Sequence, residues 1–517
     1  MAIKNIVICS DGTGNSANKD RGTNVFKLFE ALDLKGHLAD PPQIEQIAFY
    51  DDGVGTESFK PVRIMGGAFG WGLSGHVREL YAALVRSYNP GDRIYLFGFS
   101  RGAFTARTLG GFITSCGILD GRKCKTDAAL RKAVENAYNV YRSGYMTGFN
   151  RRIRRTVWRV PAHESPSAPR FKAQLARFRE EHAPHEGKIE FIGVWDTVDA
   201  VGLPFDHLAG FINYFIYPFK FGDRSFSLQV KRGCHAIAID DERHTFHPMM
   251  WNETAETRAR ISQVWFAGVH SNVGGGYPKQ GMSLVSLDWM MDQAEKAGLK
   301  FNLPDRVYVR NHANVNGKLY NSRAGYAVFY RYKPRDIATF CSSAGTIPKI
   351  HDSVLERILL QTEGYAPGNL PISMEVVATD GAQTRQSRQV AAIATSFKET
   401  YSTLDRAPAL VKLRRSSHYV FLALSVALVA VLVIPQFSVQ GDWWGLIKAI
   451  FSLDRNTLIE GFKLNSWSAV MLLALVAVFF LIQLLAENSM KRRFSGFWHK
   501  LITALSGSRS VGPVQSS

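Results

Sequence analysis

The sequence predicts an α/β fold: a mainly parallel sheet flanked by helices, with insertions and a C-terminal pair of transmembrane helices. Three observations support this prediction. Short apolar runs alternate with stretches of helical spacing along much of the 517-residue chain. Several of these runs end in polar, glycine-containing loops, as strands do at the carboxyl edge of a parallel sheet. Near the C-terminus, two apolar runs of about 20 residues contain no charge.

The alternation predicts a specific set of elements. Strands are expected at residues 3–9, 46–50, 94–97, 189–195 and 262–269. Helices are expected around residues 25–32, 77–84, 103–112, 130–141 and 283–297. The glycine-rich stretch from Gly66 to Gly75 is expected to be a loop. Because helices connect the strands, both faces of the sheet should be covered.

Composition limits the class of protein. The 46% hydrophobic content supports a large core, and the length predicts two or three domains. The five cysteines show no paired spacing and no neighbouring histidine cluster, which argues against a zinc site or a disulfide framework. Residues 1–5 lead straight into a strand, so no cleavable signal peptide is expected.

The formal net charge of +18 indicates an anionic partner: lipid headgroups, a phosphorylated substrate or nucleic acid. The sequence contains no zinc finger, RNA-recognition motif or basic helix with base-reading spacing. Membrane lipids are therefore the expected partner, and nucleic-acid binding is not expected.

The stretch from Ile94 to Arg107 carries the strongest chemical signal. A short apolar strand is followed by Gly98-Phe-Ser-Arg-Gly102 and then by apolar residues at helical spacing. A nucleophile elbow requires this context, because the two glycines leave room for the crossing backbone and the serine is raised at the edge of the sheet. Ser100 is therefore the candidate nucleophile. The alternative is an ordinary serine in a tight glycine turn.

A serine nucleophile needs a histidine base and an acid that orients the histidine. In alpha/beta-hydrolases the acid and then the histidine follow the serine along the chain. Asp196 directly follows one apolar strand and His270 ends a later one, so both should project at the same edge of the sheet. Asp199 is an alternative acid, and either candidate could instead be a capping or loop-stabilising residue. The competing histidines are His235, His244 and His247.

Backbone N–H groups near the nucleophile are expected to stabilise an oxyanion. Arg101 supplies one such group, and Gly12 or Thr13 could supply a second from the loop after the first strand. Asp11 in that loop could instead bind a cation or tie loops together. No recognised metal-ligand spacing is present, and neither a metal nor a cofactor is expected.

Two segments interrupt the alternation of strands and helices. Residues 121–187 begin as a helix and become strongly basic between Arg151 and Arg179. They form either a cap that meets anionic headgroups or a solvated surface insertion. The stretch from Phe205 to Phe221 is unusually aromatic, and it is either core packing or an apolar mouth for acyl chains.

Residues 419–437 and 467–486 are each long enough to cross a membrane as a helix. Basic clusters at residues 412–415 and 491–493 lie on the same side of this hairpin, and such clusters stay in the cytoplasm. The catalytic domain is therefore expected on the cytoplasmic side of a membrane, taken to be a bacterial inner membrane. The predicted domains are a catalytic domain (1–400), a basic linker (401–418), the two spans with their connection (419–486) and a basic tail (487–517).

Six motifs occur in order along residues 3–370. They are Ser10-Asp-Gly-Thr13, Gly53-Val-Gly-Thr56, Gly98-Phe-Ser-Arg-Gly-Ala103, Val194-Trp-Asp-Thr197, Asp241-Glu-Arg243, and Val264-Trp-Phe-Ala-Gly-Val-His-Ser271 with Gly274-Gly-Gly-Tyr277. Together they resemble the family catalogued as domain of unknown function 2235. That family is similar to the catalytic domain of the type VI secretion phospholipase effectors called the Tle-one-like group.

The resemblance implies an alpha/beta-hydrolase fold, a triad of Ser100, Asp196 and His270, and the phospholipase A activity of the effectors. Asn272 stands where the family often has an acidic residue, and the hairpin departs from a simple secreted toxin. We therefore expect a membrane-anchored serine hydrolase that cleaves phospholipid or other acyl-lipid esters. The alternatives are a hydrolase of a soluble ester or thioester, and a membrane-acting protein whose hairpin is the functional part.

Overall fold

The computed structural model describes residues 2–12, 22–52, 71–144, 169–198, 224–379, 387–438 and 455–507. The chain divides into two compact units. The first unit comprises Met1–Ser322, Pro334–Tyr365 and Asn369–Lys398, and the second comprises Arg323–Lys333, Ala366–Gly368 and Glu399–Ser517. Several predicted features lie outside the described residues: Thr13, the Gly53–Thr56 motif, the basic stretch 151–159, Asp199 and the aromatic segment 205–221.

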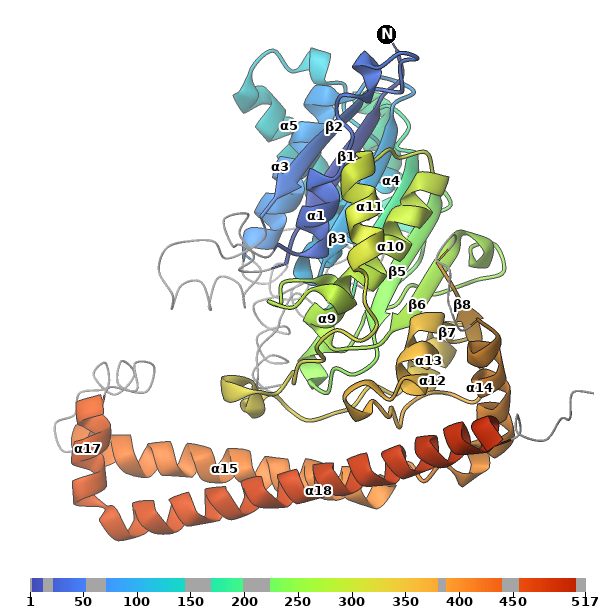
Figure 1. Cartoon of the computed structure of the whole chain (residues 1–517). Coiled ribbons are helices and arrows are strands. Elements are labelled where there is room, and N and C mark those ends of the chain that lie inside the picture. The colour runs from blue at the N-terminus through green and yellow to red at the C-terminus, as the bar shows by residue number, and fades with distance from the viewer. Residues whose placement is uncertain are drawn as a thin grey trace, which may run out of the picture. The chain divides into compact units, whose positions relative to one another are not determined.

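The first unit is built on an eight-stranded sheet in which all neighbouring strands are parallel (Figure 1). The strands are β1 (Asn5–Ser10), β2 (Gln46–Asp51), β3 (Arg93–Phe99), β4 (Ile189–Trp195), β5 (Val230–Ala238), β6 (Ile261–Phe266), β7 (Lys349–His351) and β8 (Glu375–Val377). Their order in the sheet is β2-β1-β3-β4-β5-β6-β7-β8. The order reverses beside β1, and ligands gather at such a point outside the carboxyl ends of the strands.

Helices cover both faces of this sheet (Figure 1). One layer contains α3 (Trp71–Ser87), α4 (Arg101–Cys116), α5 (Asp127–Ser143) and α7 (Pro169–His182). The other contains α1 (Asn24–Glu30), α10 (Gly281–Lys296) and α11 (Leu303–His312). Further α-helices among the described residues are α9 (His270–Gly274), α12 (Ile337–Ser343), α13 (Asp352–Leu359) and α14 (Ser387–Thr400). The predicted α/β class is thereby confirmed.

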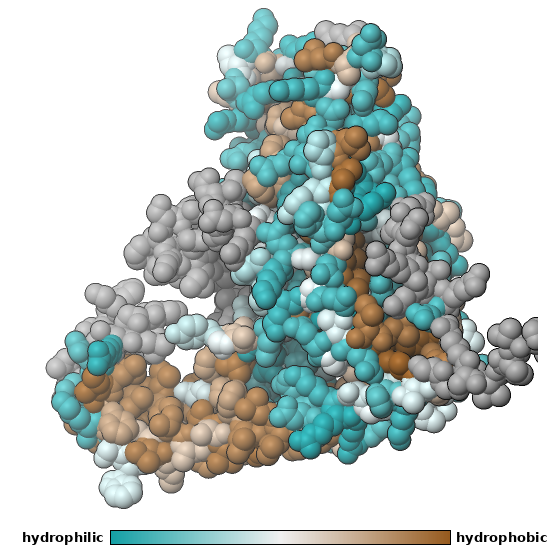
Figure 2. Space-filling model, viewed as in Figure 1, coloured by the Kyte–Doolittle hydropathy of each residue, from teal (hydrophilic) through white to brown (hydrophobic). Residues whose placement is uncertain are grey.

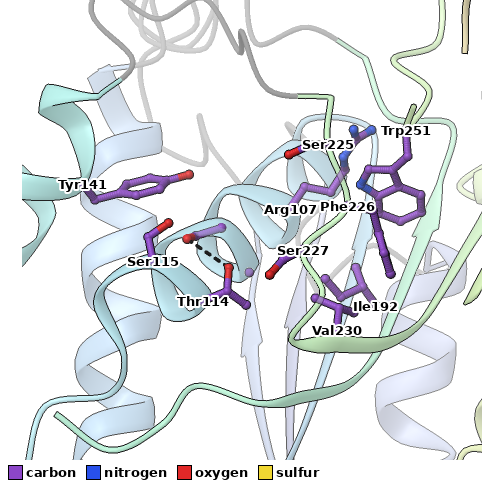
Figure 3. A pocket seen from close by; sticks show the side chains of 12 residues that line it. Arg107, Thr114, Ser115, Tyr141, Ile192, Ser225, Phe226, Ser227, Val230 and Trp251 are labelled. Atoms are coloured by element: carbon purple, nitrogen blue, oxygen red, sulfur yellow. Dashed lines mark hydrogen bonds between the residues drawn. The ribbon is translucent and has the colours of Figure 1, made fainter. Parts of the chain in front are cut away.

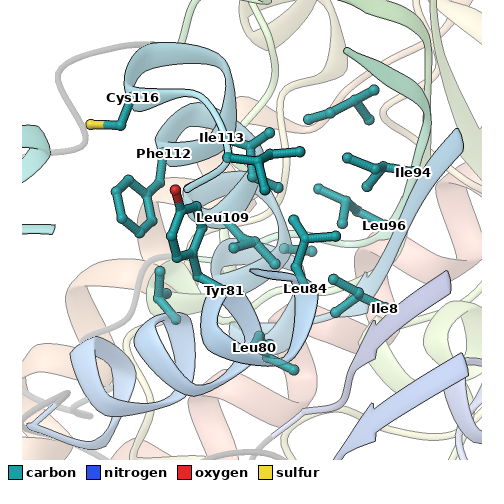
Figure 4. Close-up of a cluster of buried hydrophobic side chains, with 14 of the residues drawn as sticks. Ile8, Leu80, Tyr81, Leu84, Ile94, Leu96, Leu109, Phe112, Ile113 and Cys116 are labelled. Atoms are coloured by element: carbon teal, nitrogen blue, oxygen red, sulfur yellow. The ribbon is translucent and has the colours of Figure 1, made fainter. Parts of the chain in front are cut away.

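The core under α3 and α4 shows how the apolar pattern produces this packing. Figure 4 shows Leu84, Ile94 and Leu96 packed between the helices and the sheet. The rings of Tyr81 and Phe112 stack with their centroids 4.1 Å apart. Each fully buried side chain of this size contributes roughly 1.5–3 kcal/mol to folding. This packing fixes α4, and therefore the turn that precedes it, against the centre of the sheet.

The structure differs from the sequence-based expectation in the sheet and in one loop. Strands β5, β7 and β8 are additional to the predicted set. β5 is hard to recognise because its first half carries Lys231 and Arg232, which pair with Glu190 and with Ser262 and Gln293. The stretch Gly66–Gly75 was expected to be a loop, but α3 already begins at Trp71.

The helix α5 belongs to the core layer rather than to a detached segment. Leu130, Val134 and Tyr138 are buried in the same cluster as α3 and α4. Arg179 in α7 donates hydrogen bonds to the carbonyl oxygens of Ser115 and Thr114 at the end of α4. Because residues 145–168 are not described, a cap formed by the basic stretch remains a prediction.

The second unit is dominated by a helical hairpin formed by α15 (Pro408–Ser438) and α18 (Ser466–Gly507), with α17 (Arg455–Leu464) between them. Both long helices are apolar enough to cross a membrane, and apolar side chains cover much of the hairpin face seen in Figure 2. Arg414 pairs with Glu487 at 2.6 Å, and the rings of Phe421 and Phe480 lie 6.0 Å apart. The two helices are therefore antiparallel and extend beyond the predicted spans, so the flanking basic clusters are also helical.

Candidate active site

Ser100 lies on a sharp turn between β3 and α4. Its backbone has φ 58° and ψ −120°, a conformation that costs a non-glycine residue about 1–3 kcal/mol. A Cβ atom at Gly98 would overlap the carbonyl oxygen of Gly102, and one at Gly102 would overlap that of Ser10. The N–H of Ser100 donates to the carbonyl oxygen of Trp195 at 3.1 Å, which ties the turn to β4. Strain held this way is a recurrent feature of functional turns.

His270 and Asp196 lie beside this serine. His270 begins α9 after β6, and its Nε2 atom is 2.8 Å from Ser100 Oγ. The Nδ1 atom of His270 is 2.5 Å from Asp196 Oδ2, and Asp196 directly follows β4. All three side chains are buried. The sequence-predicted residues are therefore in one hydrogen-bonded chain, although they come from positions up to 170 residues apart.

Arg335 binds both carboxylate oxygens of Asp196. Its Nη1 atom is 2.6 Å from Asp196 Oδ1 and its Nη2 atom is 2.8 Å from Asp196 Oδ2. The same guanidinium donates to the carbonyl oxygens of Ala238 and Phe246. Burial alone would raise the pKa of Asp196, but the charge and hydrogen bonds of Arg335, together with the bond to His270, hold that pKa well below its usual range. Asp196 therefore stays ionised.

His270 is held through its backbone and its ring. Asp241 Oδ2 accepts a hydrogen bond from the His270 N–H at 3.2 Å, and Arg243 pairs with the same carboxylate at 2.7 Å. The imidazole lies between two rings, with centroids 4.6 Å from Phe99 and 5.0 Å from Phe246. These contacts restrict the imidazole to the orientation in which it meets both the serine and the carboxylate.

The predicted oxyanion groups are only partly described. Arg101 is the first residue of α4, so its N–H belongs to a helix N-terminus, where anions are stabilised. The N–H of Gly12 donates to Asp11 Oδ1 at 2.6 Å in this structure. Thr13 lies outside the described residues. The assignment of Gly12, Thr13 and Arg101 therefore stays a prediction.

Asp11 ties together the loop that faces the elbow. Its Oδ2 atom accepts hydrogen bonds from the hydroxyls of Thr23 at 2.5 Å and Tyr50 at 2.7 Å. Burial raises the pKa of Asp11 to about 6 despite these bonds. Among the described residues, no group of three or more His, Cys, Asp or Glu side chains could hold a metal ion.

The competing histidines have other surroundings. His235 is fully buried in β5, where its Nε2 atom accepts a hydrogen bond from the Thr197 N–H at 3.1 Å. His244 and His247 face each other with ring centroids 4.9 Å apart.

A cavity of about 240 Å³ lies further along α4 (Figure 3). Arg107 lines it, with its guanidinium 4.7 Å from the centroid of the Trp251 ring. Burial and the charge of Arg224 lower the pKa of Arg107 to about 9. The cavity is also lined by Gly110, Gly111, Thr114, Ser115, Tyr141, Ile192, Ser225, Phe226, Ser227 and Val230. The three predicted catalytic residues are not part of its lining.

The parallel sheet with helices on both faces defines an α/β protein whose buried serine, histidine and aspartate meet at the carboxyl edge. The family comparison agrees with this architecture. The chain belongs to the family of the type VI secretion phospholipase effector Tle1-like catalytic domain, whose model matches residues 4–293. Residues 4–293 therefore form a phospholipase-type catalytic domain.

Two further proteins are similar to this chain. The uncharacterized protein YEL023C of Saccharomyces cerevisiae is 29% identical over 256 residues, which cover 47% of this chain and 32% of that protein. The chain thus spans about a third of the length of this relative. A crystal structure of an uncharacterized protein from Pseudomonas aeruginosa is 19% identical with a TM-score of 0.33, and covers 60% of this chain and 49% of that one.

Sequence reasoning missed the residues that support the predicted triad. Asp241 and Arg243 fall in one of the family motifs, so the sequence marked these residues but did not indicate what they do. Arg335 lies beyond the family match, and no pattern in the sequence marks it. Only its position in the fold reveals its contact with Asp196.

Proposed function

We propose that this chain is a membrane-anchored serine hydrolase that cleaves ester bonds of phospholipids or other acyl lipids. One observation carries the proposal: the Ser100 hydroxyl on a strained turn lies 2.8 Å from His270, which lies 2.5 Å from the Asp196 carboxylate. This arrangement occurs in a domain of a phospholipase effector family, which favours a lipid ester over other acyl substrates.

The proposed reaction proceeds through an acyl-enzyme. His270 Nε2 accepts the proton of Ser100 Oγ while that oxygen attacks the ester carbonyl. Asp196 stabilises the imidazolium that forms, and the N–H of Arg101 stabilises the oxyanion. His270 then donates its proton to the leaving alcohol. A water molecule, deprotonated by His270, hydrolyses the acyl–Ser100 ester and restores the free serine.

The hairpin supports anchoring in a membrane. Two helices long and apolar enough to span a bilayer lie antiparallel, and about four-fifths of each apolar window is outside the protein core. Because Arg414 pairs with Glu487, the basic clusters at residues 412–415 and 491–493 lie at the same end of the hairpin. We infer that this end, and with it the catalytic domain, faces the cytoplasm.

Labelling with a fluorophosphonate probe tests the nucleophile in membranes that contain the full-length chain. The wild type should be labelled, and Ser100→Ala should not. Ser353→Ala is the matched control, because Ser353 Oγ also lies 2.8 Å from a histidine, His351, but that histidine is the N-cap of α13. Loss of labelling in Ser353→Ala but not in Ser100→Ala would contradict the proposal.

Fatty-acid release identifies the substrate class. The wild type should release fatty acid from phospholipid vesicles, and Ser100→Ala should not. Cleavage of soluble short-chain esters or thioesters without any release from vesicles would instead favour the soluble-ester alternative. A membrane effect that persists in Ser100→Ala would favour the hairpin as the functional part.

A further inference from the structure

A short segment that precedes α15 and α18 in the sequence belongs to the same compact unit as these helices. Residues Arg323–Lys333 belong to the second compact unit, whereas the residues on either side of them belong to the first. The segment contains a 3-10 turn, Gly325–Phe329. A segment that leaves a catalytic domain to pack on membrane helices is a candidate for membrane contact itself.

The composition of this segment suits a membrane interface. Residues 324–330 carry no charge and include three aromatic side chains. Tyr326 is 90% exposed, although a tyrosine is usually placed where its ring is at least partly covered. Arg323 and Arg331 flank the turn on its two sides. Aromatic rings between basic residues are typical of protein segments at the headgroup level of a bilayer.

Two contacts fix the depth of the turn along α15. The guanidinium of Arg331 lies 5.4 Å from the ring centroid of Tyr419, the first residue of the uncharged run. The ring of Phe329 stacks on Phe421 with centroids 5.6 Å apart. At a rise of about 1.5 Å per residue, Phe421 is about 3 Å further into the apolar part of the helix. The turn therefore lies at the end of the span.

Buried polar side chains that precede Tyr419 on α15, together with their partners, mark the same end of the apolar run. Arg323 Nη2 and Gln483 Oε1 each lie 3.1 Å from His418 Nδ1. One turn further from the apolar run, Arg414 pairs with Glu487. Polar groups of this kind are expensive inside hydrocarbon unless they are paired, so their position defines where the span ends. The turn lies beside this boundary.

We propose that residues 324–330 form a third contact with the bilayer, in which Tyr326 enters the interface between headgroups and acyl chains. The inference rests on the proposed spanning of the hairpin. The partner is the lipid bilayer rather than another protein, because the exposed surface beside the turn continues into the lipid-facing side chains of the span. Tyr419 and Val420 are 40% and 39% exposed, and Val426 is 60% exposed. Arg331, which is partly exposed at one end of the turn, favours anionic headgroups.

The turn is close in sequence to a residue of the candidate site. Arg331 is separated by only three residues from Arg335, which pairs with the Asp196 carboxylate. In this arrangement the turn contacts the membrane, and Ser100 and its partners carry out the chemistry.

Depth-dependent fluorescence quenching tests the proposal in the full-length chain. Cys124 is the one partly exposed cysteine among the five and is replaced by serine, because the other four are buried. Tyr326→Cys then carries an environment-sensitive fluorophore in vesicles of phosphatidylcholine and phosphatidylglycerol. Nitroxide lipids with a shallow or a deep label serve as quenchers. We expect loss of fluorescence at position 326, greater with the shallow label than with the deep one.

Two matched positions make the result decisive. Val426→Cys, in the middle of the first span, should be quenched more strongly by the deep label. Tyr308→Cys, on α11 and 55% exposed, should be quenched by neither. Quenching at 426 but not at 326 would overturn the third contact alone, whereas no quenching at either would overturn the membrane anchoring on which it rests. If Tyr326→Cys does not fold, Ala324→Cys on the same exposed turn replaces it.

Discussion

Arg335 and Asp196 form a bidentate ion pair with N–O distances of 2.6 Å and 2.8 Å, and both side chains are fully buried. The Asp196 carboxylate is therefore shared between a guanidinium and the His270 imidazole. A rotation of the Asp196 carboxylate would break its contact with Arg335 or with His270 and leave a buried charged or polar group unpaired. We infer that Arg335 positions Asp196 for its proposed role, and this gives the first prediction.

Arg335→Met should lower kcat by roughly 10²-fold, because the carboxylate loses the partner that fixes its position. Removing one member of a buried pair should also destabilise the fold by about 3–5 kcal/mol. Arg335 lowers the pKa of Asp196, so this carboxylate favours folding above its unfolded pKa and loses that effect as the pH falls. Without Arg335, the acid limb of the activity profile should therefore move to higher pH.

Two variants separate positioning from simple stability. Arg335→Lys keeps a charge and should recover part of kcat. Arg306→Met removes another buried, ion-paired arginine, which binds Asp288, and should lower stability without moving the acid limb. A pH profile of Arg335→Met identical to that of the wild type would assign Arg335 a structural role only. The measurement is kcat against pH, with unfolding followed by circular dichroism.

Asp196→Asn should reduce kcat by about 10⁴-fold, because an amide neither fixes the imidazole tautomer nor stabilises its cation. Combining Asp196→Asn with Ser100→Ala should cost little more than Ser100→Ala alone, since the residues act as one unit. Vesicle hydrolysis rates of the single and double variants measure this. Activity within about tenfold of the wild type would point to a different acid.

Gly102→Ala should impair the elbow, because its Cβ would overlap the carbonyl oxygens of Ser10 and Asp11. Overpacking of this kind costs about 1–3 kcal/mol, and a displaced Ser100 should also lose fluorophosphonate labelling. Gly75→Ala in α3 is the control, because nothing lies within 4 Å of its Cβ position. That variant should gain about 0.5–1 kcal/mol of stability and label normally. Equal labelling of both variants would refute the tight-turn argument.

Asp11→Asn should change how stability depends on pH. The pKa of Asp11 is raised to about 6, so the folded state holds this proton more tightly than the unfolded state. Stability of the wild type should therefore fall relative to the variant as the pH rises from about 4 to about 6, by up to about 3 kcal/mol.

Denaturant unfolding of the detergent-solubilised chain at several pH values measures this difference. Asp120→Asn is the control of opposite sign, because the hydrogen bond from Arg122 lowers the pKa of Asp120. There the wild type should gain relative to the variant as the pH rises. A pH-independent difference for Asp11→Asn would show that its carboxyl is not shifted upward.

Local patterns in the sequence were sufficient for the elbow and the hairpin. Strand, glycine, serine, glycine and helix are contiguous at residues 94–107, and the requirements of the turn are met by neighbours in sequence. The two apolar runs can be recognised by their length alone, because a helix needs about 20 apolar residues to cross the hydrocarbon core of a bilayer. The candidate acid and base were identified because each follows a recognisable strand.

The rest depended on contacts between distant parts of the chain. Arg335 meets Asp196 across 139 residues, and no periodicity or motif records such a pairing. β5 was not predicted because its first half carries Lys231 and Arg232, whose partners Glu190 and Gln293 lie on other elements. The stacking of Phe329 on Phe421 likewise joins two segments that look unrelated in sequence.

The sequence by itself determined the α/β class, the serine turn and the apolar hairpin, because each follows from the order of residues within a short stretch. Only the tertiary structure decided that Asp196 is paired with Arg335, that His270 is held by Asp241, and that Phe329 packs on Phe421. The physical reason is that burial and charge pairing depend on which segments meet in space, and that is settled by the packing of the whole chain.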